Sequence, residues 1–278
     1  MFSTTIAQIT DTHIRSPEIP SFFDFNPVDF LKGAVAHMDS LPTKPDAVII
    51  TGDLADCGRE DEYELYLDIL KPLEMPVYVI PGNHDDRDNL RKVFRPTHGY
   101  MPAEGFLHYV VDDMPIRMIA LDTTIDGEDG GMLCEERLNW LNARLNEAKD
   151  RPTLIFMHHP PLSTYMAEMD RLNCRNGDDL RALLKNHPQV VRVTCGHLHR
   201  TVQLRWEHAI VGVGPSTAHQ LHLDFTPGML TQYIMEPPGM LLHMWDEKQG
   251  LITHTMPIGD YAGPYDFHKA RADDRHDV

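Results

Sequence analysis

The stretch VTCGHLHR, residues 193–200, runs from an apolar segment into a glycine and then into two histidines one residue apart. A short β-branched run of this kind is typical of a buried strand, and the glycine allows a sharp exit from it. Side chains two positions apart in extended backbone point to the same side, so His197 and His199 can face a shared partner. One pair of histidines decides little alone, so the ends of the other predicted strands must be compared with it.

The chain alternates short apolar runs with longer segments of helical period. This alternation predicts layered α and β structure. The sequence predicts strands over 6–10, 47–51, 77–80, 117–121, 153–157 and 190–194. It predicts helices over 26–38, 60–70, 135–148 and 177–186, the first with Asn26 as its cap and Pro27 in its first turn.

Five of these six predicted strands are followed by aspartate, asparagine or histidine. In open α/β sheets this carboxyl edge is where ligands bind. Each short motif is weak by itself, because polar groups at strand ends are often only turn formers or caps. The full order D-x-H, GD, GNHD, H and GH-x-H is a strong indication of one assembled site. Its residues are Asp11, His13, Asp53, Asn83, His84, His158, His197 and His199.

Composition limits the classes of partner. The 278 residues, 42% of them hydrophobic, are enough for a sizeable core. The formal net charge of −17 argues against a nucleic-acid partner and against an anionic membrane surface. The start of the chain does not resemble a signal peptide, and the four scattered cysteines include no C-x-x-C pair. We therefore expect a cytoplasmic protein with reduced thiols.

These ordered blocks resemble those of the calcineurin-like metallophosphoesterase superfamily. More narrowly, the chain is similar to bacterial class III cyclic-nucleotide phosphodiesterases and to related glycerophosphodiesterases. The resemblance rests on ITDTHIR, TGDLADCGREDEY, IPGNHDDR, FMHHPPL, CGHLH, STAHQ and YAGP, and so extends from Ile9 to Pro264. It implies an α/β fold, a four-layer αββα sandwich of two mixed sheets flanked by helices, with a smaller antiparallel cap.

The resemblance also implies a centre of two divalent metal ions. One ion would be held by Asp11, His13, His199 and the bridging Asp53. The other would be held by Asp53, Asn83, His158 and His197. Carboxylate, imidazole and amide ligands suit Mn, Fe, Co or Zn, and these four remain open. A hydroxide bridging the two ions would attack phosphorus, Asp53 being catalytic as the ligand that both ions share, and His84 would act beside the substrate phosphate as an acid or by stabilising charge.

Weaker predictions concern the surroundings of this centre. His219 matches a family position that reaches over the substrate, and Asn176 either lines the pocket or caps a helix. Asp122, at the end of a strand, is a candidate partner for a histidine. Phe22 and Phe23 would form an apolar wall for a leaving group or would anchor their loop.

The family pattern divides the chain into a catalytic core over 1–200, to which 256–278 returns, and a cap over 201–255 that would also mediate homo-oligomer formation. The preferred function is hydrolysis of a small phosphodiester, with glycerophosphodiesters and 3′,5′-cyclic nucleotides both open. A phosphomonoesterase or protein phosphatase of the same superfamily, and a binding scaffold with a dead site, are the alternatives.

Overall fold

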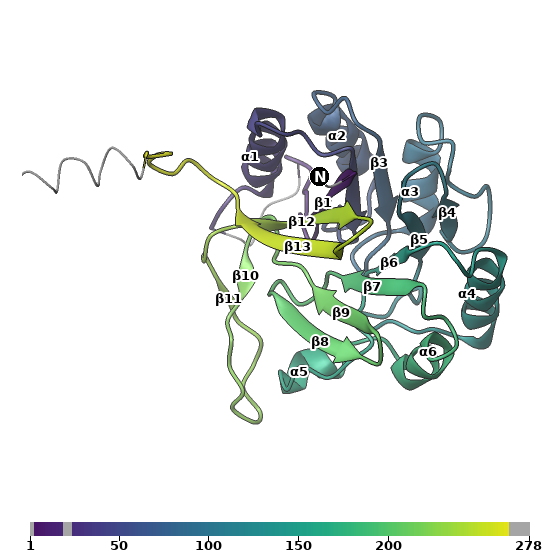
Figure 1. Ribbon diagram of the computed structural model, residues 1–278. Coiled ribbons are helices and arrows are strands. Elements are labelled where there is room, and N and C mark those ends of the chain that lie inside the picture. Colours follow the sequence, from purple (N-terminus) through teal and green to yellow (C-terminus); the bar gives the residue numbers. More distant parts are fainter. Residues whose placement is uncertain (1–2, 19–23, 267–278) are drawn as a thin grey trace, which may run out of the picture.

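The computed structural model describes residues 3–18 and 24–266, which form two β-sheets packed face to face between two layers of helices (Figure 1). Phe22, Phe23 and the terminal residues 267–278 lie outside the described part of the chain. The expected four-layer αββα architecture is confirmed by this arrangement.

The first sheet has the strand order β13-β12-β1-β2-β3. Strands β1, β2 and β3 are parallel, whereas β12 pairs antiparallel with β1 and β13 pairs antiparallel with β12. Helices α1, α2 and α3 share a buried apolar core with its outer face. The bounds are β1 (Thr4–Ile9), β2 (Ala47–Thr51), β3 (Val77–Ile80), β12 (Gly239–Asp246), β13 (Gly250–Pro257), α1 (Pro27–Ser40), α2 (Glu60–Leu70) and α3 (Arg87–Phe94).

The second sheet has the strand order β4-β5-β6-β7-β9-β8. Its central strands β5, β6, β7 and β9 are parallel, and β4 and β8 are antiparallel edge strands. Its outer face packs against α4, α5 and α6 in a separate apolar core. The bounds are β4 (Tyr109–Val111), β5 (Arg117–Leu121), β6 (Thr153–Met157), β7 (Val190–Cys195), β8 (Val202–Trp206), β9 (Ala209–Val213), α4 (Glu135–Glu147), α5 (Ala167–Asp170) and α6 (Gly177–Leu184).

The inner faces of the two sheets meet in a third apolar core. Ile49 and Ile80 of the first sheet pack there with Leu154 and Phe156 of the second. Strands that bury both faces read as continuous apolar runs rather than as alternating ones, which is how β2 and β6 read in the sequence. This packing brings the carboxyl ends of the parallel strands of both sheets to the same side of the molecule.

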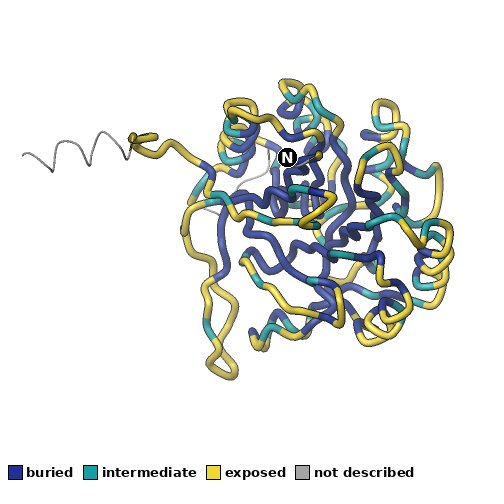
Figure 2. Tube along the Cα trace, in the orientation of Figure 1, coloured by how far each residue is buried: buried dark blue, intermediate teal, exposed yellow. Residues whose placement is uncertain are grey.

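The segment 201–255 is divided between the two sheets. Strands β8 and β9 extend the second sheet, while β12 and the start of β13 belong to the first. The part outside both sheets is 214–238, which we call the arm; it contains the short pair β10 (Gln220–Leu221) and β11 (Tyr233–Ile234). The far end of the arm projects from the body and is exposed (Figures 1 and 2). Apart from short turns, the arm is thus the part of the predicted cap that belongs to neither sheet.

A buried ion pair ties α3 to the second sheet. The carboxylate of Asp122 accepts hydrogen bonds from Arg87 Nε at 2.8 Å and from the Leu107 amide at 3.0 Å. Asp122 does have a histidine neighbour, because its backbone amide donates to His108 Nδ1 at 2.9 Å, but His108 is not one of the predicted metal ligands. Burial would raise the pKa of Asp122, but the neighbouring guanidinium outweighs it and holds this pKa below its ordinary value.

We expect Asp122→Asn to lower the free energy of unfolding by about 3 kcal/mol at pH 7, because it leaves the mostly buried Arg87 without its buried charge partner. Since the folded-state pKa is depressed, the contribution is complete above about pH 4 and is lost as the pH falls through the folded-state value. Urea unfolding at pH 7 and at pH 3 measures it. The control is Asp126→Asn, which removes the exposed partner of Arg87 and should cost less than about 1 kcal/mol. Equal losses in the two variants would contradict the prediction.

Candidate metal centre

The ends of β1, β2, β3, β6 and β7 place seven predicted ligands within one cluster. Strands β1 to β3 carry the residues contributed by the first sheet, and β6 and β7 carry those of the second. The donor atoms fall into two groups that share the carboxylate of Asp53. The cluster contains Asp11, His13, Asp53, Asn83, His158, His197 and His199.

The first group joins residues from β1, β2 and β7. His13 Nε2 lies 3.2 Å from His199 Nε2 and 3.7 Å from Asp53 Oδ2. His199 Nε2 lies 3.3 Å from Asp11 Oδ1. The candidate ligand atoms of these four residues all lie within 4.8 Å of one another, and all four residues are buried. This first group therefore has the form of a closed cage with two carboxylates and two imidazoles.

The second group joins the ends of β2, β3, β6 and β7. His158 Nε2 lies 3.4 Å from Asp53 Oδ2 and 3.1 Å from Asn83 Oδ1. His197 Nδ1 lies 3.0 Å from the same Asn83 oxygen. This group has one shared carboxylate, one amide oxygen and two imidazoles, so it carries less negative charge than the first.

The spacing of the donor atoms fits metal ions. Ligand atoms held about 2.1 Å from one ion are roughly 3.0–3.4 Å apart in octahedral or tetrahedral geometry. Most of the neighbouring separations above fall in that range. His199 Nδ1 lies 2.9 Å from the His219 carbonyl, so in the neutral ring Nε2 carries a lone pair; it faces His13 Nε2 at 3.2 Å and is able to bind a cation.

Glycines make the close approach possible. Gly52 has φ +95°, which favours glycine, and a Cβ atom there would overlap the ring of His158. A Cβ atom at Gly82 would overlap the carboxylate of Asp53. At both positions, therefore, the absence of a side chain lets the backbone approach the site closely.

Both cluster carboxylates are charged. Burial would raise the pKa of Asp11, but His199 outweighs burial and holds this pKa below its ordinary value. Burial acts on Asp53 in the same way, and His158 and His84 hold its pKa well below the ordinary value. Two buried carboxylates with ligand atoms within 4.8 Å of each other favour positive charge between them, which bound cations would supply.

His84 lies at the rim of the cluster, outside the two groups that share Asp53, although one of its ring nitrogens is within 4.8 Å of donor atoms of His13 and Asp56. Its side chain is 40% exposed, and its ring packs edge-on against His13 with centroids 4.7 Å apart. Its backbone amide donates to Asp53 Oδ1 at 2.9 Å. Burial disfavours its charged form, but Asp53 and Asp56 outweigh this and raise the pKa of His84.

Asp56 is a site residue that the sequence reasoning missed. Its carbonyl oxygen lies 3.0 Å from His84 Nδ1, and its carboxylate lies 3.5 Å from His13 Nδ1. It thus holds one rim histidine and one cluster histidine at once. The available signal was its place three residues after Asp53 in TGDLADCG, since a short loop there must pass close to the site.

The two weaker substrate candidates lie in different surroundings. His219 is buried in the arm, with its ring 4.5 Å from that of His199 and 5.5 Å from that of His13. Asn176 is exposed and occupies the cap position of α6, where its side chain donates to Asp179. Among the contacts of the described residues, none places Asn176 against the cluster.

Neighbouring polar residues organise the loops. The carboxylate of Asp85 accepts from the Leu54, Ala55 and Gly82 amides at 2.9–3.1 Å, which ties the loop after β2 to the loop after β3. His159 Nδ1 lies 2.8 Å from Thr123 Oγ1, and its ring packs beside those of His158 and His197, with centroids 4.7 Å away from each. A ring nitrogen of His159 also lies within 4.8 Å of those of His158 and His197. The four cysteines are free thiols, as the sequence predicted.

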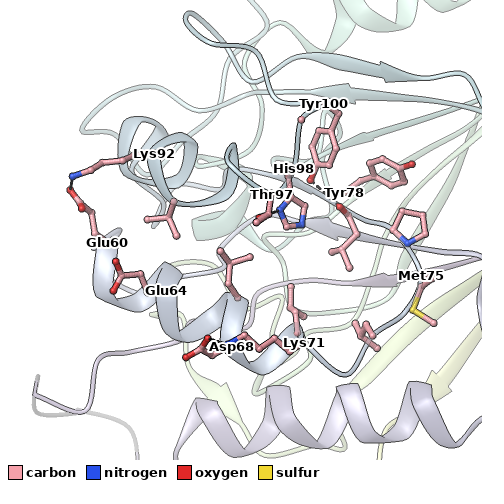
Figure 3. Close-up of a pocket in the computed structure, with 17 residues that line it drawn as sticks. Glu60, Glu64, Asp68, Lys71, Met75, Tyr78, Lys92, Thr97, His98 and Tyr100 are labelled. Carbon is pink, nitrogen blue, oxygen red and sulfur yellow. Dashed lines mark hydrogen bonds and ion pairs between the residues drawn. The ribbon is translucent and has the colours of Figure 1, made fainter.

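A second concavity lies apart from the cluster. A groove of about 930 Å³ opens beside α2, α3 and β3 (Figure 3). Four of its charged groups form two ion pairs, Lys92–Glu60 at 2.6 Å and Lys71–Asp68 at 2.6 Å. The Tyr100 hydroxyl also bonds to the backbone, donating to Val77. No set of free polar groups converges in the part of the groove that the structure describes, so the cluster remains the candidate site.

An αββα sandwich with two donor groups sharing one carboxylate defines a protein with a candidate dinuclear metal centre. The chain belongs to the calcineurin-like phosphoesterase family, whose model matches residues 4–201. This finding confirms the resemblance read from the sequence.

Individual relatives cover nearly the whole chain. A probable glycerophosphodiester phosphodiesterase of Arcobacter nitrofigilis is 40% identical over 96% of this chain and 98% of its own length. A 3′,5′-cyclic-nucleotide phosphodiesterase of a Nostoc species is 28% identical over 91% of this chain and 94% of its own. The solved structure of a dimetal phosphatase from Danio rerio shares the fold, with a TM-score of 0.62 and 16% identity over 93% of this chain and all of that one. Among the described residues, no helix combines the length and apolar character needed to cross a membrane.

Proposed function

We propose that this chain hydrolyses small phosphodiesters, glycerophosphodiesters in particular, at a centre of two divalent metal ions. The observation that carries the proposal is the convergence of seven ligand side chains in two groups that share Asp53. A scaffold with a dead site would be expected to lack ligands, whereas each position of the family pattern here holds a residue able to bind metal.

The ligand roles follow from the two donor groups. Asp11, His13 and His199 would hold one ion, and Asn83, His158 and His197 would hold the other, with Asp53 as the shared ligand. The donor set suits Mn, Fe, Co or Zn. When bound, two such ions supply a nucleophile at neutral pH and neutralise charge that develops on phosphorus oxygens. Their four positive charges exceed the two negative charges of Asp11 and Asp53, which allows an acidic protein to attract an anionic substrate.

His84 is placed to act on the substrate. Its Nδ1 donates to the Asp56 carbonyl, so Nε2 is the ring atom left to contact a ligand. From the exposed rim of the cluster, a protonated Nε2 can donate to a phosphoryl oxygen or to the leaving alkoxide. His219, whose ring covers His13 and His199, is proposed to limit the space above the substrate. Asn176 lies at the cap position of α6, and no role in binding the substrate is proposed for it.

Glycerophosphodiesters are preferred because the relative acting on them is the more similar one, at 40% identity against 28% for the cyclic-nucleotide enzyme. The test is a panel of glycerophosphocholine, glycerophosphoethanolamine, cyclic AMP, bis(p-nitrophenyl) phosphate and p-nitrophenyl phosphate, each with and without a chelator. We expect chelator-sensitive hydrolysis with kcat/KM highest for the two glycerophosphodiesters. Preference for cyclic AMP would favour the second candidate, preference for the monoester a phosphatase, and no metal-dependent turnover a scaffold.

We also propose that the protein is cytoplasmic and assembles with copies of itself through the arm. The exposed part of the arm carries large apolar side chains at Leu223, Phe225, Met229, Leu230, Tyr233, Ile234 and Met235. Large exposed apolar side chains gathered in one segment are often part of an interface. The other methionines of the region do not contribute in the same way, since Met240 is buried in the first core. Light scattering of the purified chain tests assembly, and a monodisperse monomer would contradict it.

A further inference from the structure

Several residues of the metal cluster have a left-handed backbone conformation, which residues other than glycine rarely adopt. Eight described residues other than glycine have positive φ, and five of these are predicted metal ligands. They are Asp11 (φ 53°), His13 (46°), Asp53 (51°), His197 (72°) and His199 (47°). A left-handed residue costs roughly 1–2 kcal/mol, and it persists only where neighbouring structure holds it. The contacts that hold these residues are therefore part of the site.

Asp11 is held from the arm. Ser216 Oγ donates to the Asp11 carbonyl at 2.9 Å, and the Thr217 amide donates to the Thr10 carbonyl at 3.0 Å. The Thr10 amide donates in return to Thr217 Oγ1 at 3.3 Å. The backbone just before Asp11, at Thr10, and the carbonyl of Asp11 itself are thus held by residues more than 200 positions away in the sequence.

The same few residues orient His199. Its Nδ1 donates to the His219 carbonyl at 2.9 Å, which leaves Nε2 facing Asp11 and His13. The brace, residues 216–219, is itself rigid: Ser216 Oγ accepts from the Ala218 amide at 2.9 Å, and Ser216 is fully buried. One short segment therefore contacts two of the three ligands that belong only to the first donor group, Asp11 and His199.

We propose that Ser216 is a positioning residue for the metal position formed by Asp11, His13 and His199. It acts through the Asp11 backbone, which it holds in the left-handed conformation that aims the carboxylate at His199. The inference rests on the proposed function, because it requires that this group binds metal. Hydrogen bonds that orient metal ligands are worth about 10- to 100-fold in metal affinity when they are removed.

The test is a titration of the metal-free full chain with Zn²⁺ in competition with a fluorescent chelator. It compares the wild type, Ser216→Ala, Asn83→Ala and the double variant. Asn83→Ala removes a ligand of the second position only, so its remaining affinity reports the first. We expect Ser216→Ala to weaken Zn²⁺ binding about 10- to 100-fold in both backgrounds.

Thr153→Val is the matched control. Thr153 Oγ1 is fully buried and donates to the Arg151 carbonyl at 2.9 Å, at the start of β6 and so at the opposite end of the sheet. It should lower the melting temperature of the metal-free protein without changing Zn²⁺ affinity. If Ser216→Ala fails to fold, Thr217→Val is used instead, because it removes the hydrogen bond from the Thr10 amide to Thr217 Oγ1. We expect that variant to lose Zn²⁺ affinity by at least about threefold. If the wild type binds Zn²⁺ tightly and neither Ser216→Ala nor Thr217→Val weakens that binding, the inference about Ser216 is overturned, whereas the proposed function stands. No uptake by the wild type would overturn the proposed function as well.

Discussion

Replacing Asp53 with asparagine is expected to lower the metal-dependent turnover of bis(p-nitrophenyl) phosphate by at least about 10³-fold. Asp53 Oδ2 is the oxygen that both donor groups share, at 3.7 Å from His13 Nε2 and 3.4 Å from His158 Nε2. Stabilisation of charge by bound ions is worth several kcal/mol in such reactions, and each 1.36 kcal/mol is a factor of ten in rate. The substitution keeps the size of the side chain and removes the charge between the two positions.

The matched control is Asp46→Asn, at the other end of the same strand. Asp46 lies just before β2 and accepts a hydrogen bond from the Thr5 amide at 2.8 Å, remote from the cluster. The turnover of the Asp46→Asn variant should stay within about twofold of the wild type, since substitutions at exposed positions usually change stability very little. Steady-state rates at saturating metal give both values. Less than a tenfold loss in Asp53→Asn would remove the shared carboxylate from the account.

The second large effect is expected from His84→Ala, which should lose at least about 100-fold in turnover while retaining both metal ions. His84 contributes no atom to either donor group, yet its ring lies beside His13 at the exposed rim. A loss of turnover without a loss of metal therefore separates a residue that acts on the substrate from a ligand. Rates and metal content are measured on the same samples.

His254→Ala serves as the control for a lost imidazole, because His254 is exposed on the edge strand β13. Wild-type turnover in His84→Ala would exclude His84 from the chemistry. Loss of metal in that variant would instead make it a ligand, contrary to its placement.

Much of the fold was predictable because its central strands bury both faces. Continuous apolar runs gave β2, β3, β5 and β6 at their observed bounds, and α2 was also predicted at its observed bounds. The polar residues after these strands could be assigned to one edge because parallel strands end together. Local signals and the order of the motifs were sufficient for this part.

Other features depend on contacts between distant segments. Strand β12 pairs with β1 from more than 230 residues away, so its place in the first sheet has no local signal. Helix α3 was missed because only Leu90 and Phe94 form its buried face, too few to mark a helical period. The same reason hid the bond from Ser216 to Asp11, which exists only after the arm has folded back onto β1.

Metal content is the most direct test of the whole account. The protein is stripped with a chelator, re-equilibrated with excess Mn²⁺ or Zn²⁺, passed over a desalting column in buffer that contains the free ion, and assayed by elemental analysis. We expect two ions per chain in the wild type and fewer than two in Asp53→Asn. A wild-type chain that takes up no more metal than a protein without the cluster would contradict the central claim.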